Sequence, residues 1–419
     1  MKILLLAPHP FFQQRGTPIA EKMLAEVLVR HGHQVEVLTF PEGEDPEIPG
    51  VAVHRAPAIP GVRDLRPGFS WKKLVYDAAM LWSCLRRVRR GRFDLVHAVE
   101  ESAFLAILLK ALFGVPYVYD MDSGLVRQMT DKFAWLRRLT PLLEVFEKRA
   151  VRGAVGVLAV CRSLEEQARA WKPGGLIARV EDVSLIEPVE QSDVLRPGPD
   201  LLFSGPQGNR GPLVLYVGNL EPYQGIDLLL GAFGHALRRV PDARLLVIGG
   251  NPESIEHYTN LAERMNLSAS ARFAGPRPVA MLGAYLRHAT VLVSPRTQGT
   301  NTPMKIYSYL DAGRALLATR LPTHTQVLDD DIAYLVEPEP AAMGEALARL
   351  LEDRALRERL AVNAREFARR EFTPQAFESK ILRFYGAVAR AMGLEEIHGE
   401  TAGHRQDRPE IDDRRARQG

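Results

Sequence analysis

The chain has 419 residues, of which 46% are hydrophobic and 25% are charged, and its formal net charge is +3. This length exceeds one ordinary hydrophobic core, so we expect two domains of a globular protein. The nearly neutral charge indicates no particular class of partner. Cys84 and Cys161 form neither a disulfide framework nor a metal-binding pattern, which fits a reducing, cytoplasmic compartment.

The first half of the chain alternates predicted strands and helices. The opening apolar run is too short for a signal peptide and predicts a strand at residues 2–7. A helix should follow, capped by Thr17 and ending near Gly32. Further strands are predicted, with helical segments between them, at residues 34–40, 94–99, 116–122 and 155–160. The apolar run at residues 103–113 contains Lys110 and is too short to span a bilayer.

The second half repeats this alternation after a stretch rich in Pro and Gly at residues 187–211, which predicts an interdomain linker. Helices are predicted at residues 226–240 and 303–312. Strands are predicted at residues 213–218, 244–250, 271–275, 290–294, 315–319 and 332–338.

This pattern predicts an α/β protein with two doubly wound, Rossmann-like domains that face a central cleft. The first domain should comprise residues 1–186 and the second residues 212–370. Residues 371–392 predict a helix that returns to the first domain, and the polar residues 393–419 predict a disordered tail.

The segment GTNTPMKIYSYLDAG, residues 299–313, is the most informative part of the chain. It places a loop of small and polar residues between a predicted strand and the start of a helix. Backbone N–H groups and the helix dipole make such a position favourable for phosphate. Arg296 before the loop and Lys305 in the first turn add positive charge. A nucleotide diphosphate is the ligand that suits this arrangement best.

The motifs of the chain, taken in order, resemble a known family. They are FFQQRGTPIA, DLVHAVEESAF, YVGNLEPYQGIDLLL, the strand end IGG and TNTPMKIYSYLDAGRALLATRLPTHTQVL. Together with the two-domain plan, they resemble the retaining glycosyltransferases of family 4, which have the GT-B fold, over about residues 1–390.

The resemblance implies an activity and a division of labour between the domains. A sugar would pass from a nucleotide-diphosphate sugar to a glycan, lipid-linked or small-molecule acceptor, with retention of configuration and without a metal or other cofactor. The leaving phosphate would help to deprotonate the acceptor. The donor would bind to the C-terminal domain, and the acceptor mostly to the N-terminal domain.

The resemblance and the predicted strand ends assign the residues of the site. The catalytic candidates are Asp122, His97, Lys305 and Arg296. The acceptor side comprises Thr17, Glu100 and Asp120. The donor side comprises Gly16, Gly218, Asn219, Gln224, Gly225, Gly250, Arg277, Thr300, Asn301, Thr302, Pro303 and Ser308.

The chain departs from the family pattern in its charged residues. Asn219 and Gln224 stand where the family usually has a basic pair, and Ser308 stands where it has a glutamate. Because cations stabilise a diphosphate leaving group, Arg296 and Lys305 are expected to supply this charge instead. The departures leave two alternatives open: a non-catalytic or unusual-donor homologue, and an epimerase or hydrolase on the same fold.

Three further features have two interpretations each. Asp120 and Asp122 lie on one side of a strand, so they would bind a metal, or else contact sugar hydroxyls or handle protons. His97 would be a ligand or a core residue. Residues 70–92 and 132–152 are basic and aromatic, which predicts peripheral contact with an anionic membrane or two solvated helices. No nucleic-acid-binding module is recognisable, so we expect no nucleic-acid partner.

Overall fold

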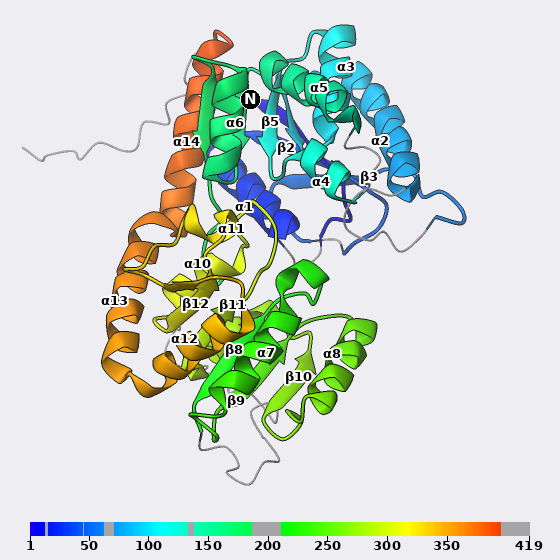
Figure 1. Cartoon of the computed structure of the whole chain (residues 1–419). Coiled ribbons are helices and arrows are strands. Elements are labelled where there is room, and N and C mark those ends of the chain that lie inside the picture. Colours follow the sequence, from blue (N-terminus) through cyan, green and yellow to red (C-terminus); the bar gives the residue numbers. More distant parts are fainter. Residues whose placement is uncertain (13–15, 45, 63–70, 133–137, 187–210, 395–419) are drawn as a thin grey trace, which may run out of the picture.

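The computed structural model describes residues 1–394 except residues 13–15, 45, 63–70, 133–137 and 187–210. The described residues form two parallel sheets, each covered by helices on both faces, with the sheets in separate domains (Figure 1). This confirms the predicted α/β fold with two Rossmann-like domains. Nearly all of the predicted linker at residues 187–211 and of the predicted tail at residues 393–419 lies outside the described residues.

The first domain is built on a seven-stranded sheet with the order β3-β2-β1-β4-β5-β6-β7. Its strands are β1 (Lys2–Ala7), β2 (Gln34–Thr39), β3 (Val51–Arg55), β4 (Leu95–Val99), β5 (Tyr117–Met121), β6 (Gly156–Ala159) and β7 (Leu176–Arg179). Its helices are α1 (Gly16–Arg30), α2 (Trp71–Arg90), α3 (Ser102–Phe113), α4 (Leu125–Lys132), α5 (Thr140–Gly153) and α6 (Arg162–Trp171). Residues 3–7 of β1 are completely buried, as expected for a strand with helices on both faces.

The second domain has a six-stranded sheet with the order β10-β9-β8-β11-β12-β13. Its strands are β8 (Leu213–Val217), β9 (Arg244–Ile248), β10 (Ala271–Gly275), β11 (Val291–Ser294), β12 (Ala315–Thr319) and β13 (Tyr334–Val336). Its helices are α7 (Ile226–Ala236), α8 (Pro252–Arg264), α9 (Leu282–His288), α10 (Lys305–Asp311), α11 (Pro322–Thr325), α12 (Pro340–Glu352) and α13 (Arg354–Glu371).

The last described helix, α14 (Pro374–Ala391), leaves the second domain and packs against α1 and β7 of the first (Figure 1). Its apolar side chains Phe377, Ile381 and Phe384 belong to the core on that face of the first sheet. The chain therefore crosses between the domains twice, and the second crossing fixes its C-terminal helix to the N-terminal domain.

Some elements differ from the prediction. The edge strands β3 and β7 were not predicted, because a half-exposed edge strand lacks the continuous apolar run of a central one. Helix α7 ends at Ala236 rather than at residue 240, and α10 begins at Lys305 rather than at residue 303. Helix α1 begins at Gly16, so Thr17 lies inside its first turn and does not precede the helix. Among the described residues, no helix is both long and apolar enough to cross a membrane.

Candidate active site

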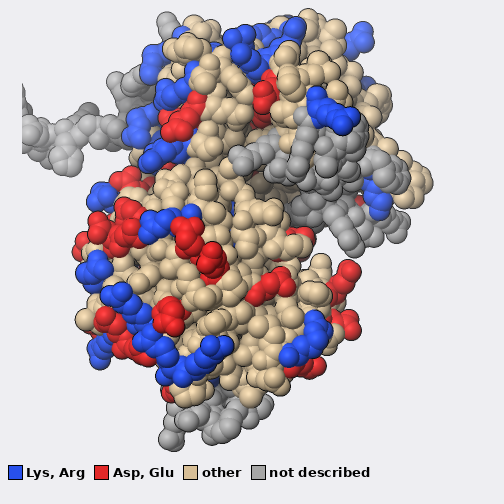
Figure 2. All heavy atoms as spheres, viewed as in Figure 1, with Lys and Arg blue, Asp and Glu red and all other residues tan. Residues whose placement is uncertain are grey.

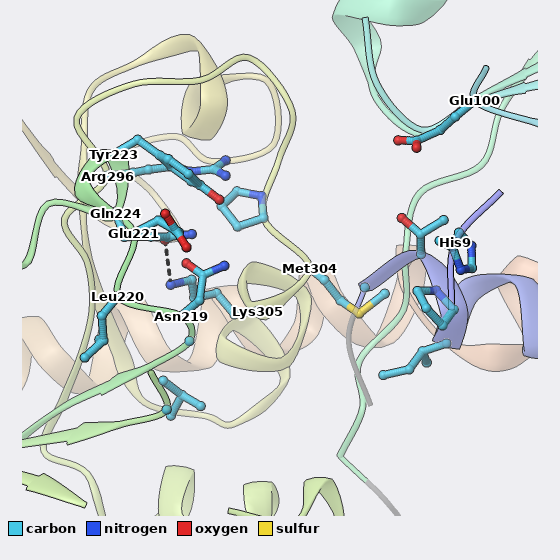
Figure 3. A pocket seen from close by; sticks show the side chains of 18 of the residues that line it. His9, Glu100, Asn219, Leu220, Glu221, Tyr223, Gln224, Arg296, Met304 and Lys305 are labelled. Carbon is cyan, nitrogen blue, oxygen red and sulfur yellow. Dashed lines mark hydrogen bonds between the residues drawn. The ribbon is translucent and has the colours of Figure 1, made fainter. Parts of the chain in front are cut away.

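A cavity of about 1300 Å³ lies between the two domains and is lined by both. Its polar residues follow the carboxyl ends of strands, where parallel sheets place their ligands. His9 and Glu100 come from the first domain, and they face Asn219, Gln224 and Lys305 of the second across the cavity (Figure 3). The volume exceeds the ~300–1000 Å³ of most small-molecule sites, so two substrates could bind side by side.

Lys305, at the start of α10, places a partly buried amine in the wall of this cavity. Its Nζ donates to Gln224 Oε1 at 3.1 Å and lies 3.9 Å from the centre of the Tyr216 ring (Figure 3). Loss of hydration lowers the pKa of Lys305 well below its usual range, and the charge of Arg296 lowers it further. An anion bound at this point would raise the pKa of the amine again, so the position favours phosphate.

Arg296 follows β11 and supplies a second cation. Its Nη1 donates to Asn301 O and to Thr323 Oγ1, both at 2.8 Å, which fixes the side chain in place. The guanidinium lies 5.1 Å from the centre of the Tyr223 ring. Its Nε atom is buried and meets no hydrogen-bond acceptor among the described residues.

Glycines let three loops approach one another at the donor side of the cavity. A Cβ on Gly218 would lie 2.8 Å from Lys305 Nζ, and one on Gly250 would lie 2.6 Å from Leu220 Cδ1. Gly225 is left-handed, with φ of 75°, and its Cβ would lie only 1.9 Å from Pro295 O. This contact brings the turn after β8 against the residue that precedes Arg296. Gly225 thus shapes the site without lining the cavity.

The structure brings twelve of the residues assigned from the sequence to the cavity wall: Gly16, Thr17, Glu100, Gly218, Asn219, Gln224, Gly250, Arg277, Arg296, Pro303, Lys305 and Ser308. The others, Gly225, Thr300, Asn301, Thr302, His97, Asp120 and Asp122, lie outside the lining. The loop before α10 therefore reaches the cavity mainly through Pro303, Met304 and Lys305.

Thr300 and Asn301 instead connect the loop to its surroundings. The backbone carbonyl of Asn301 accepts from Arg296 and from Thr323 Oγ1, and Asn301 Nδ2 donates to Asp122 O of the first domain at 2.5 Å. Gln326 Nε2 donates to Thr300 O. Since these groups already have partners within the protein, the loop positions Arg296 and bridges the domains.

His97 and Asp120 form a buried chain of hydrogen bonds. His97 is completely buried, its Nε2 lies 3.0 Å from Asp120 Oδ2, and Tyr385 OH of α14 lies 2.7 Å from its Nδ1. Both ring nitrogens therefore have protein partners. Of the two interpretations that the sequence left open for His97, the structure supports the core residue. Burial raises the pKa of Asp122 well above its usual range, and the charge of Asp120 raises it further.

Sequence reasoning missed His9, Tyr216 and Tyr223. His9 follows β1, lines the cavity, and places its Nε2 2.9 Å from Oε1 of the buried Glu21. Glu21 and the other nearby carboxylates raise the pKa of His9, although burial opposes this. A histidine directly after the first strand was the available signal. No sequence pattern marks the two tyrosines, because their contacts with Lys305 and Arg296 exist only in the folded chain.

No group of three or more His, Cys, Asp or Glu among the described residues is arranged to hold a metal ion.

Two family models match the chain, one in each domain. Residues 19–180 match the glycosyl transferase 4-like domain, and residues 211–353 match the glycosyl transferases group 1. This chain belongs to the group 1 glycosyltransferases. It is therefore a glycosyltransferase of the family 4 type with the GT-B fold, which agrees with the family resemblance of its motifs.

Known proteins align with nearly the whole length of this glycosyltransferase. Phosphatidyl-myo-inositol mannosyltransferase of Mycobacterium tuberculosis is 26% identical over 397 residues, which are 93% of this chain and 97% of the relative. Sucrose-phosphate synthase from Thermosynechococcus elongatus superposes with a TM-score of 0.75 at 21% identity, covering 93% and 100% of the two chains. Anabaena Alr3699/HepE in complex with UDP and glucose gives a TM-score of 0.70 at 16% identity, covering 92% and 100%.

Gln224 and Ser308, two of the departures from the family pattern, both form hydrogen bonds within this glycosyltransferase. Gln224 Oε1 accepts from Lys305 and from Tyr216 OH, which lies 3.2 Å away. The side chain that replaces a usual cation thus holds the Lys305 amine at the turn after β8. Ser308 is buried, and its Oγ accepts from the backbone N–H of Leu185 at 2.9 Å, which connects α10 to the first domain.

Proposed function

We propose that this glycosyltransferase transfers a sugar from a nucleotide-diphosphate sugar to a lipid-linked acceptor, with retention of configuration. The observation that carries the donor half is the pair of cations, Lys305 and Arg296, beside the close-packed glycine turns. Two cations in the wall of one cavity stabilise the charge that develops on a diphosphate leaving group. The Anabaena protein with the same fold was solved with UDP and glucose, which supports this class of donor.

A thermal-shift screen of the full chain against UDP, GDP, ADP, TDP and CDP, with their common sugar conjugates, tests the donor. A ligand at a hundred times its Kd stabilises the folded state by about 2.7 kcal/mol. For domains of this size, that raises the melting temperature by roughly 5–10 °C. We expect this shift with one nucleoside diphosphate. If none gives a shift at millimolar concentration, the proposed donor site is wrong, and the non-catalytic alternative gains support.

Retention and independence from metal rest on the family resemblance. In the proposed reaction, the oxygen of the acceptor attacks the anomeric carbon, the bond to the diphosphate breaks, and the leaving phosphate takes the acceptor proton. Lys305 and Arg296 would neutralise the leaving group. Proton NMR of the product should show the anomeric configuration of the donor, and excess EDTA should leave the rate unchanged. An inverted product, or loss of activity in EDTA, would contradict this part of the proposal.

The acceptor half of the proposal rests on an apolar face of the first domain. Helices α2, α3 and α5 are neighbours and expose large hydrophobic side chains. We define the apolar face as Leu74, Trp82, Phe104, Leu108, Leu112, Phe113, Leu139, Leu142, Val145 and Phe146, each at least 37% exposed. A patch of this kind on a folded domain indicates contact with a protein or a membrane.

Charge and continuity favour a membrane as the occupant of the apolar face. Exposed Arg86, Arg89 and Arg90 flank it at the end of α2, and basic side chains predominate on the visible side of the first domain (Figure 2). Basic residues beside exposed apolar side chains suit an anionic bilayer surface. Leu74, Phe104 and Phe146 of the same face also line the cavity, so a lipid could enter the site directly from a membrane.

Substitution at the apolar face should weaken binding to anionic vesicles. Leu142 and Val145 are 56% and 59% exposed and lie outside the cavity lining. In Leu142→Glu/Val145→Glu, two apolar contacts are lost and two negative charges are added, so we expect vesicle co-sedimentation to fall by about tenfold or more. Val362→Glu on α13, at a side chain 55% exposed, is the matched control and should bind normally. Equal binding by both variants would contradict membrane contact through this face.

A further inference from the structure

The two halves of the cavity differ in their balance of charged residues. On the side of the second domain, the lining includes three basic residues, Arg277, Arg296 and Lys305, which suit a diphosphate, and one carboxylate, Glu221. On the side of the first domain, it includes three carboxylates, Asp77, Glu100 and Glu101. Lys73 is the only Lys or Arg of the first domain in this lining, as far as the described residues go.

Only part of the negative charge on this side is neutralised within the protein. Lys73 Nζ forms an ion pair with Glu101 Oε1, and both side chains are largely buried. Glu100 Oε1 accepts from Ser123 Oγ at 2.9 Å, a neutral donor. Asp77 Oδ1 is buried and meets no hydrogen-bond donor among the described residues. Burial raises the pKa of Asp77 to about 7, and the charge of Glu101 contributes to this rise. This side of the cavity therefore keeps the negative charge of Glu100 and gains that of Asp77 above neutral pH.

An apolar slot lies directly beside these carboxylates. Leu74 is one helical turn before Asp77 on α2, and Phe104 and Leu105 are one turn after Glu101 on α3. The slot continues with Val126, Met129, Leu143 and Phe146. A ligand that fills both parts has an apolar chain next to a polar group. The slot is also continuous with the apolar face, through which a lipid would enter.

We propose that the acceptor is a lipid-linked molecule whose headgroup presents hydroxyl groups and carries no phosphate or other negative charge. Carboxylates accept strong hydrogen bonds from hydroxyl groups, whereas a phosphate near Asp77 and Glu100 would be repelled. A like charge at contact distance weakens binding by about fivefold in water and by more at a partly buried position. This inference rests on the proposed function and narrows its acceptor.

The electrostatic selection should be measurable with two amphiphiles that have the same dodecyl chain and different head groups. Dodecyl glucoside has an uncharged polyol head, and dodecyl phosphate is an anion at neutral pH. At pH 8, where Asp77 is ionised, and with both ligands below their critical micelle concentrations, we expect the full-length protein to bind the glucoside at least about tenfold more tightly by calorimetry. In Asp77→Asn/Glu100→Gln, two charges are removed with little change in shape, so this ratio should fall by about tenfold.

Glu144→Gln on α5 is the control for the charge change. Glu144 is exposed and lies outside the cavity lining, so this variant should keep the wild-type ratio. The inference is overturned if dodecyl phosphate binds as tightly as the glucoside, if neither binds, or if the double variant keeps the wild-type ratio. The measurement needs no donor and no turnover. A failed donor screen with a preserved head-group ratio would therefore count against the transferase proposal alone.

Discussion

Lys305→Met is expected to lower kcat by about a hundred- to a thousandfold, which is the usual effect of removing one group that stabilises developing charge. Methionine keeps much of the length of the side chain and removes its charge. The amine now has Gln224 as its hydrogen-bond acceptor and the Tyr216 ring beside it, and no carboxylate of the described residues forms an ion pair with it. Because burying an unpaired amine costs free energy, the variant should be at least as stable as the wild type.

The comparison requires the rate, the nucleotide affinity and the melting temperature of each variant. Lys22→Met on α1 is the matched control, since Lys22 lies outside the cavity lining. Its Nζ forms a 3.7 Å ion pair with Glu26 and lies 5.5 Å from the centre of the Phe12 ring. It should keep the wild-type rate. Unchanged donor affinity and unchanged kcat in Lys305→Met would remove Lys305 from the site and leave Arg296 as its principal cation.

Gly225→Ala should destabilise the second domain by about 4 kcal/mol or more, which is exceptional for one methyl group. The added Cβ would lie 1.9 Å from Pro295 O and 2.9 Å from Pro295 C, and backbone atoms move only with their loop. The left-handed φ of 75° adds about 1–2 kcal/mol of strain. Thermal denaturation should show a midpoint lower by roughly 10 °C. Nucleotide binding should weaken as well, because Arg296 follows Pro295 directly.

Gly114→Ala is the control that separates the steric clash of an added Cβ from the strain of a left-handed backbone. Gly114 has nearly the same backbone conformation, with φ of 72°, but nothing lies within 4 Å of its added Cβ. This variant should lose only the roughly 1–2 kcal/mol of the left-handed conformation. If both variants lost equal stability, the close approach of Gly225 to Pro295 would have no energetic role.

Hydrophobic patterning predicted the central strands of both sheets. The strand predicted at residues 2–7 is β1. The strand predicted at residues 213–218 is β8, which ends one residue earlier, at Val217. These strands are buried on both faces, so their sequences are continuously apolar, and the signal is local. The edge strands β3 and β7 carry partly exposed residues, and their strand conformation depends on the pairing with β2 and β6. A local pattern could not show that pairing.

Site residues were predictable where a charged residue or a glycine follows a predicted strand and belongs to a motif. Lys305, Arg296 and Gly218 follow strands and belong to a motif, and all three line the cavity. Asn301 and His97 have equally suggestive chemistry and positions, but their hydrogen bonds join them to Asp122 and to Tyr385. Their partners lie far away in the sequence, so no spacing rule distinguishes such a structural residue from one that faces a ligand.

The sequence by itself determined the fold class, the two-domain plan and the family, and it predicted phosphate binding by Arg296 and Lys305. These properties follow from periodicity, loop composition and local motifs. The tertiary structure alone decided that Gln224 orients the Lys305 amine, that His97 is buried against α14, and that the cavity is more basic on one side and more acidic on the other. Such properties depend on distances between residues that only folding brings together, and those distances determine burial, pKa and access to a ligand.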